Sequence, residues 1–151
     1  MALIAPLSVL VVDDSDAFLT SVVEWVAERR DLCLVGTARS GPEALDAIEL
    51  LSPDLVILDA ILPGIDGFRL TRAIKKRAGA PLVVLVTFHA SAAAREEAHA
   101  VGADGFLGKQ DFTDGFESLL AGWAEGEAGR TWRATTLVTP VRRGSRNEQD
   151  L

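Results

Sequence analysis

The stretch PDLVILDAILPGIDGF, residues 53–68, decides how this sequence folds. Residues 55–58 form an unbroken aliphatic run that ends at Asp59. A continuous run of this kind predicts a strand buried on both faces, as in a parallel sheet covered by helices. The sequence therefore places a carboxylate at the end of a core strand, where its charge needs a partner.

Aliphatic runs of the same kind recur along the chain and alternate with longer amphipathic segments. Strands are expected at residues 7–12, 32–36, 54–59, 81–86 and 105–108. Helices are expected at residues 16–30, 41–51, 67–77, 91–103 and 111–126. This alternation predicts an α/β fold, in which a five-stranded parallel sheet forms a flavodoxin-like (βα)5 doubly wound sandwich with strand order 2-1-3-4-5.

The same pattern assigns particular side chains to the core. Phe18 and Trp25 fall on the inward face of the first expected helix, and Ala73 falls on that of the third. Cys33 is the only cysteine, and its place in the second expected strand suggests a small core residue. A single cysteine also excludes an internal disulfide and a cysteine-based zinc site.

The composition is that of a folded, acidic protein. The chain has 151 residues, of which 48% are hydrophobic, and a formal net charge of -7. This acidity argues against nucleic acid as the main partner and fits a metal or protein partner. The N-terminus lacks the basic start of a signal peptide, and no run is long and apolar enough to span a membrane. Together with the single cysteine, these features predict a cytoplasmic protein with no nucleic-acid or membrane partner.

The composition changes near Gly126. Residues 1–125 are expected to form one domain. Residues 126–151 contain five arginines, no lysine and three acidic residues, and are interpreted as an Arg-rich C-terminal tail. The sequence ATTLVTPV, residues 134–141, has strand propensity, so the tail is expected to be flexible or to form a strand. This composition does not suit a helix-turn-helix module.

Polar side chains stand at the carboxyl ends of the expected strands. Asp13 and Asp14 follow the first strand, and Asp59 ends the third. Thr87 and Lys109 follow the fourth and fifth. In an open parallel sheet ligands bind beyond this edge, and the first and third strands are neighbours in the expected order. The three carboxylates should therefore meet, and they repel one another unless a cation joins them.

A magnesium site beside a phosphoryl-transfer centre would account for this combination. Carboxylate oxygens favour Mg²⁺, which often bridges to a phosphate. A nearby ammonium and hydroxyl would balance charge on the transferring oxygens and donate a hydrogen bond, which places Asp59 as the nucleophile. Taken singly, each residue has a plainer interpretation as a helix cap, a strand residue or a solvated lysine. Their joint occurrence at successive strand ends favours the site.

Four segments carry a resemblance to a known family. They are VLVVDDSDAF (9–18), PDLVILDAILPGIDGF (53–68), VVLVTFHA (83–90) and GADGFLGKQ (102–110). They closely resemble the receiver domains of two-component system response regulators, and the resemblance covers about residues 7–124. It implies that Asp59 accepts a phosphoryl group from a sensor histidine kinase or phosphotransfer protein, as part of a signal-transducing phosphorelay.

The resemblance also implies roles for the residues around Asp59. Asp13, Asp14 and Asp59 would hold Mg²⁺ together with the backbone carbonyl of Ile61. Lys109 would contact the phosphoryl group.

A switch is implied at two further positions. Thr87 would rotate to bond the phosphoryl group, and Phe106 would move inward as its aromatic partner. These movements would reshape the face formed by the last two helices and the strand between them. A downstream protein is expected on that face, and a homodimer is a further expectation.

The sequence departs from the family pattern beside the expected site. Gln110 follows Lys109 where many receivers have proline, which leaves the geometry of that peptide bond open. Phe88 stands where a small residue is common and is followed by His89. We expect Phe88, His89 and Ile61 to tune phosphoryl turnover and to slow it, although His89 also suits an ordinary exposed loop histidine.

The leading hypothesis is a phosphoacceptor receiver that switches protein–protein binding and is no enzyme beyond phosphorylation and dephosphorylation of its own Asp59. One alternative is the receiver half of a transcription factor whose DNA-binding domain is missing here. Another is a receiver-like interaction module that never uses phosphate. A Mg²⁺-dependent phosphatase is disfavoured because Ile61 occupies the position of its second acidic residue. A flavin site is disfavoured because the acidic sequence DDSD, residues 13–16, would repel phosphate.

Overall fold

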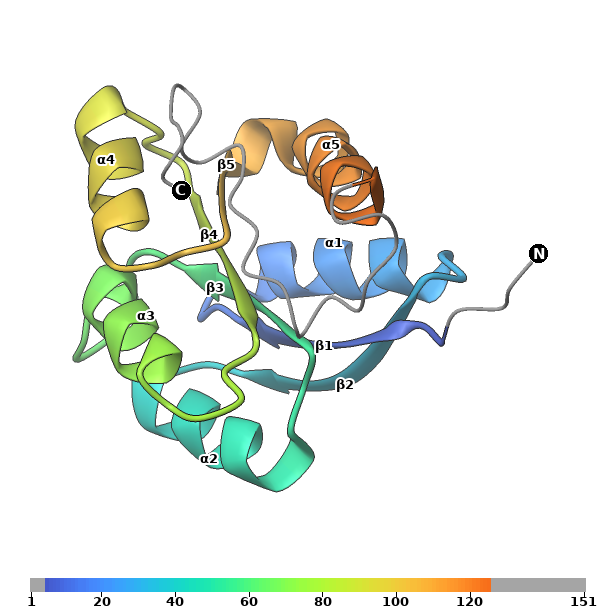
Figure 1. Ribbon diagram of the computed structural model, residues 1–151, viewed down its shortest axis with the longest axis horizontal. Coiled ribbons are helices and arrows are strands. Elements are labelled where there is room, and N and C mark those ends of the chain that lie inside the picture. The colour runs from blue at the N-terminus through green and yellow to red at the C-terminus, as the bar shows by residue number, and fades with distance from the viewer. Residues whose placement is uncertain (1–4, 126–151) are drawn as a thin grey trace.

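A computed structural model describes residues 5–125 and confirms the expected alternation of strands and helices (Figure 1). Five parallel strands form one sheet in the order β2-β1-β3-β4-β5, so the predicted fold class and strand order are correct. The predicted tail at residues 126–151 lies outside the described residues. In chain order the elements are β1 Leu7–Val12, α1 Asp16–Ala27, β2 Leu32–Ala38, α2 Gly41–Leu51, β3 Leu55–Asp59, α3 Gly67–Lys75, β4 Leu82–Thr87, α4 Ala92–Ala100, β5 Gly105–Gly108, the 3-10 helix η1 Lys109–Asp111 and α5 Phe112–Glu125.

Helices cover both faces of the sheet. In Figure 1, α1 and α5 lie on one face, and α2, α3 and α4 lie on the other. Successive residues of a strand point to opposite faces. Val9 and Val11 therefore join the cluster under α1 and α5, whereas Leu10 and Val12 join the cluster under the other three helices. This two-sided burial is why the central strands are apolar at every position.

Two assignments of side chains to the core are wrong. Cys33 is exposed, because β2 is one of the two edge strands of the sheet and is only partly covered. Ala73 is also exposed. The buried stripe of α3 consists of Gly67, Leu70, Thr71 and Ile74, and Ala73 lies about 100° around the helix from Ile74.

The backbone settles two further points. Residues 5–125 contain no cis peptide bond, so the Lys109–Gln110 bond, whose geometry the sequence left open, is trans. None of the helices in the described part of the chain has the length and apolar character needed to cross a membrane.

Candidate functional site

The five polar residues predicted at the strand ends lie along one edge of the sheet. Asp13 and Asp14 come directly after β1, Asp59 is the last residue of β3, Thr87 is the last of β4, and Lys109 comes directly after β5. Strands β1 and β3 pair with Val12 opposite Leu58, which puts the following carboxylates side by side. One carboxylate oxygen from each of the three aspartates lies within 4.8 Å of the others. The predicted meeting of the three carboxylates is therefore confirmed.

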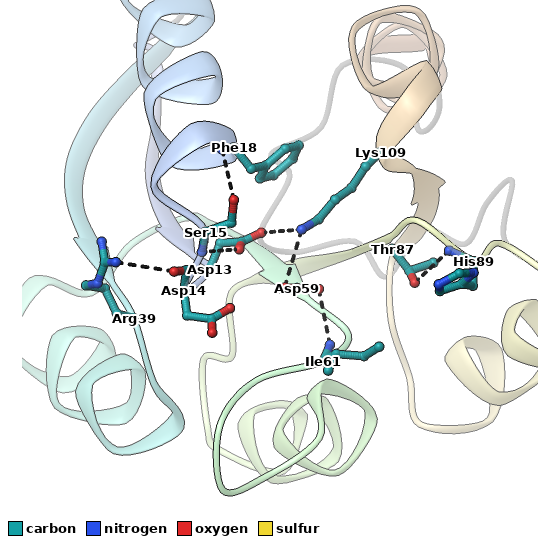
Figure 2. A network of polar contacts seen from close by, with 10 residues as sticks. All are labelled: Asp13, Asp14, Ser15, Phe18, Arg39, Asp59, Ile61, Thr87, His89 and Lys109. Carbon is teal, nitrogen blue, oxygen red and sulfur yellow. Dashed lines mark hydrogen bonds and ion pairs between the residues drawn. The ribbon is translucent and has the colours of Figure 1, made fainter.

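Lys109 extends into this cluster and contacts two of the carboxylates (Figure 2). Its Nζ lies 2.8 Å from Oδ2 of Asp13 and 3.4 Å from Oδ2 of Asp59. The side chain is only 4% exposed, so the ion pairs form with little solvent screening. An ammonium held between two carboxylates offsets the repulsion between them.

Asp13 has the geometry of a cation ligand. It is completely buried, and its Oδ1 accepts a hydrogen bond of 2.8 Å from the backbone N–H of Ser15. Its Oδ2 has the ion pair with Lys109 but no hydrogen-bond partner among residues 5–125. A buried carboxylate oxygen with this spare acceptor capacity, facing two more carboxylates, suits a hard divalent cation such as Mg²⁺.

Asp14 provides the exposed side of the cluster. Its backbone carbonyl accepts a hydrogen bond of 3.2 Å from Nη2 of Arg39, which follows β2. The same guanidinium pairs with Asp16 at 2.6 Å. Arg39 thus links the end of β2 to the loop between β1 and α1. The sequence pattern did not single out Arg39, because its contacts join segments that are distant in the chain.

Asp59 is placed to act as a nucleophile at the edge of the core. Its Oδ1 accepts a hydrogen bond of 3.1 Å from the backbone N–H of Ile61, and its Oδ2 faces Lys109. Burial raises the pKa of Asp59, the Ile61 N–H opposes this effect, the Asp13 charge adds to the rise, and Lys109 lowers the pKa. The Asp59 side chain is 10% exposed, which leaves the carboxylate open to a reactant from solvent.

Thr87 and Phe106 lie in the positions predicted for them. Thr87 is buried, and its hydroxyl accepts a hydrogen bond of 3.1 Å from the backbone N–H of His89. Figure 2 shows Thr87 and His89 together, apart from the carboxylates. Phe106 is buried as well, with the guanidinium of Arg95 5.2 Å from the centre of its ring. The role of these two residues in a switch stays a prediction.

The residues predicted to tune the site form its outer rim. Ile61 is 65% exposed and Phe88 is 56% exposed, while His89 is also at the surface. The Lys109 ammonium lies 4.9 Å from the centre of the Phe88 ring and 4.5 Å from that of Phe18. The helical pattern assigned Phe18 to packing alone, and only its place four residues after Asp14 could have linked it to the site.

Comparisons with known proteins agree with this geometry. Residues 9–118 match the family model described as "Response regulator receiver domain". A protein-glutamate methylesterase/protein-glutamine glutaminase of Myxococcus xanthus is 43% identical over 104 residues, which are 68% of this chain and 28% of that protein. The chain thus spans less than a third of this relative's length, and the enzymatic activities in the name belong to the longer protein.

Two solved structures share the fold. The signal receiver domain assigned to the response regulator NarL of Mycobacterium tuberculosis is 29% identical, has a TM-score of 0.74, and is matched over 82% of this chain and all of that one. The second structure is the P1 domain of CheA3 in complex with CheY6 from R. sphaeroides. It gives 25% identity and a TM-score of 0.63 over 78% of this chain and 98% of that one. The chain belongs to the response regulator receiver domain family of two-component signal transduction.

Proposed function

We propose that Asp59 is the phosphoacceptor of this receiver domain and that a sensor histidine kinase or phosphotransfer protein is the donor. The observation that carries the proposal is the Lys109 ammonium, which lies between the carboxylates of Asp13 and Asp59 at 2.8 and 3.4 Å. This arrangement joins a nucleophilic carboxylate to a fixed positive charge. The likeness to a structure that contains CheY6 bound to the P1 domain of CheA3 supports a kinase domain as the partner.

The reaction would form a bond between an Asp59 carboxylate oxygen and the phosphorus atom of the donor. The bond from phosphorus to the donor's imidazole nitrogen breaks at the same time, and that nitrogen keeps the electron pair and takes up a proton. The Lys109 ammonium would pair with the negative charge that develops on the phosphoryl oxygens, and the Thr87 hydroxyl would donate a hydrogen bond to one of these oxygens. The hydroxyl now accepts from His89, so it would have to turn.

Asp13, Asp14, Asp59 and the backbone carbonyl of Ile61 would hold a Mg²⁺ ion. The ion, when bound, supplies positive charge that lets an anionic donor approach three carboxylates. The spare acceptor capacity of Asp13 Oδ2 supports this assignment. The receiver unit would comprise residues 1–125.

The output would be a change in protein binding at the face formed by α4, β5 and α5. Thr87 ends β4 and Phe106 lies in β5. A rotation of the Thr87 side chain would therefore change the structure of this face. A downstream protein or a second copy of the chain would bind there. The exposed apolar rim formed by Ile61 and Phe88, together with His89, would limit the access of water and small donors and so slow turnover.

The experiment is intact mass spectrometry after incubation with Mg²⁺ and acetyl phosphate. We expect one phosphoryl group on the parent protein, none after removal of the metal, and none on Asp59→Asn. The matched control is Asp66→Asn, since Asp66 caps α3 through the Arg69 N–H and asparagine caps equally well. Labelling of Asp59→Asn at the parent level would refute the assignment. If the parent takes no label, a beryllofluoride titration decides, and absence of binding there would refute the proposal.

A further inference from the structure

The ammonium of Lys109 lies close to two aromatic rings as well as to two carboxylates. Its Nζ is 4.5 Å from the ring centre of Phe18 and 4.9 Å from that of Phe88. Both distances fall within the range of cation–π attraction, in which the negative face of a ring stabilises a positive charge. We propose that Phe18 and Phe88 are positioning residues for Lys109, which hold its ammonium over Asp59 for phosphoryl transfer. This inference rests on the proposed function of Asp59.

Phe18 forms the fixed wall of this enclosure. It lies in the first turn of α1, where its backbone N–H donates to the capping hydroxyl of Ser15 at 3.3 Å. Its ring packs edge to face against Phe112, with 5.5 Å between the ring centres. The Phe18 ring is partly buried and packs against the core under α1 and α5.

Phe88 forms the outer wall, on the loop between β4 and α4. It directly follows Thr87, and its ring is 56% exposed. Its backbone carbonyl accepts a hydrogen bond of 3.2 Å from Nε2 of Gln110. The residue after the lysine therefore holds the loop that carries the second ring.

Both walls are tied to the segment that carries the lysine. Gln110 is hydrogen-bonded to the carbonyl of Phe88, and the ring of Phe112 packs against that of Phe18. Residues 109–112 are therefore in contact with both phenylalanines. A lysine side chain is a flexible stem with a compact charge and would otherwise sample many conformations. The two carboxylates attract the ammonium at 2.8 and 3.4 Å, and the two rings lie 4.5 and 4.9 Å from it. The exposure of the lysine side chain, 4%, agrees with this enclosure.

A plainer interpretation is that the rings only cover the apolar stem of the lysine. The two interpretations differ in what a leucine would do. Leucine would cover the stem as well as phenylalanine does, but it has no ring to attract the charge. A tryptophan at the exposed position 88 would keep that attraction, since it is the strongest aromatic partner of a cation.

The test compares Phe18→Leu, Phe88→Leu and Phe88→Trp with the parent in Mg²⁺. The matched control is Phe68→Leu, which changes a half-buried ring of α3 in the opposite core cluster. The first readout is the dissociation constant of beryllofluoride from calorimetric titration. The second is the NMR signal of the Lys109 Hε protons, which ring currents shift. Because Phe88 is at the surface, its variants test the proposal even if Phe18→Leu does not fold.

We expect each leucine variant at positions 18 and 88 to weaken beryllofluoride binding about threefold to tenfold. Their Hε signals should move toward the position of an ordinary lysine. Phe88→Trp should bind like the parent, and so should Phe68→Leu. If the parent binds beryllofluoride and the leucine variants bind equally well, the two rings do not position the lysine and the proposed function still stands. If the parent itself does not bind, the proposed function falls and this inference falls with it.

Discussion

A Cβ atom placed on Gly67 would lie 2.4 Å from the backbone carbonyl oxygen of Asp59 and 2.7 Å from Cα of Ala60. Gly67 is the first residue of α3, and its N–H donates to the carbonyl of Ala60 at 2.7 Å. The start of α3 thus packs directly against the backbone at the end of β3. A glycine is needed here because a side chain would clash with the backbone that carries Asp59.

We predict that Gly67→Ala lowers the free energy of unfolding by about 1–3 kcal/mol, because backbone atoms must move to make room for the methyl group. The same shift should slow the labelling of Asp59. Urea unfolding and mass spectrometry would measure the two effects. Gly122→Ala is the control, since a Cβ there meets no atom within 4 Å and should stabilise α5 by up to about 1 kcal/mol. Equal stability of Gly67→Ala and the parent would show that the close packing is not rigid.

The fold was predictable because most of its strands are buried on both faces. The runs at β1, β3 and β4 are apolar at nearly every position, and this signal identifies a parallel sheet without reference to distant contacts. The edge strand β2 shows where the signal fails. Cys33 looks like a core residue in the sequence but is exposed, since only the position of β2 in the sheet decides how much of it is covered.

The site was predictable to the level of residues but not of contacts. Parallel strands bring their carboxyl ends to one edge, and β1 and β3 are neighbours, so Asp13 and Asp59 had to lie close together once the strand order was known. Lys109 follows β5, which β4 separates from β3, and only its long side chain brings the ammonium to the two carboxylates. The pairing of Lys109 with Asp13 depends on side-chain conformation, which the pattern does not encode. The contacts of the two rings with the lysine were not predicted, for the same reason. The helical pattern explained Phe18 as a packing residue without any reference to the site.

We predict that Lys109→Ala folds but binds Mg²⁺ more tightly than the parent by about threefold to tenfold, because the ammonium no longer competes for the carboxylates. The opposite change is expected in Asp13→Asn, which removes a ligand charge and should weaken Mg²⁺ binding. Calorimetric titration of the metal-free proteins would measure both. Weaker Mg²⁺ binding by Lys109→Ala would mean that the lysine orders the carboxylates more than it neutralises them.

The same lysine variant should lose the coupling between Asp59 and the face formed by α4, β5 and α5. In the parent, beryllofluoride with Mg²⁺ should shift the NMR signals of this face, and in Lys109→Ala those shifts should be absent even at concentrations that fill the site. Normal shifts in the filled variant would show that the signal travels through Thr87 without the lysine.

We predict a small, pH-dependent loss of stability for Arg29→Gln. Arg29 forms a fork with Asp31 at 2.8 Å, also pairs with Glu117, and lies 4.9 Å from the ring centre of Trp25. The hydrogen bond from Arg29 lowers the pKa of Asp31 in the folded protein. The pair therefore stabilises the fold at a pH above the pKa of Asp31 in the unfolded chain, about 3.9, and this contribution is lost as the pH falls through the pKa of Asp31 in the folded protein.

Asp31 is half exposed, so the expected loss at pH 7 is below about 1 kcal/mol and should shrink in acid. Urea unfolding at pH 7 and at low pH would measure it. The control is Arg30→Gln, which changes an exposed neighbour with no ion pair among the described residues. A loss that stays constant with pH would come from the contact with Trp25 instead.

The ion pair between Lys75 and the buried Asp104 gives the largest expected pH effect outside the site. Lys75 Nζ lies 2.7 Å from Oδ2 of Asp104, which also accepts a hydrogen bond of 2.9 Å from the N–H of Val83. Burial raises the pKa of Asp104, and Lys75 opposes that rise most strongly among its neighbours. Removing the ammonium in Lys75→Met should therefore raise the pKa of Asp104 further.

A carboxylic acid whose pKa is higher in the folded than in the unfolded protein favours folding when it is protonated. That favourable contribution is lost as the pH rises from the pKa in the unfolded chain, about 3.9, through the pKa in the folded protein. Lys75→Met should accordingly be less stable than the parent by about 1–3 kcal/mol at pH 7, with a gap that narrows as the pH approaches 4. Urea unfolding across this range would measure the gap, with the exposed Lys76→Met as the control. A difference in unfolding free energy that does not change with pH would mean that the packing of the Lys75 stem, and not its charge, stabilises the contact with Asp104.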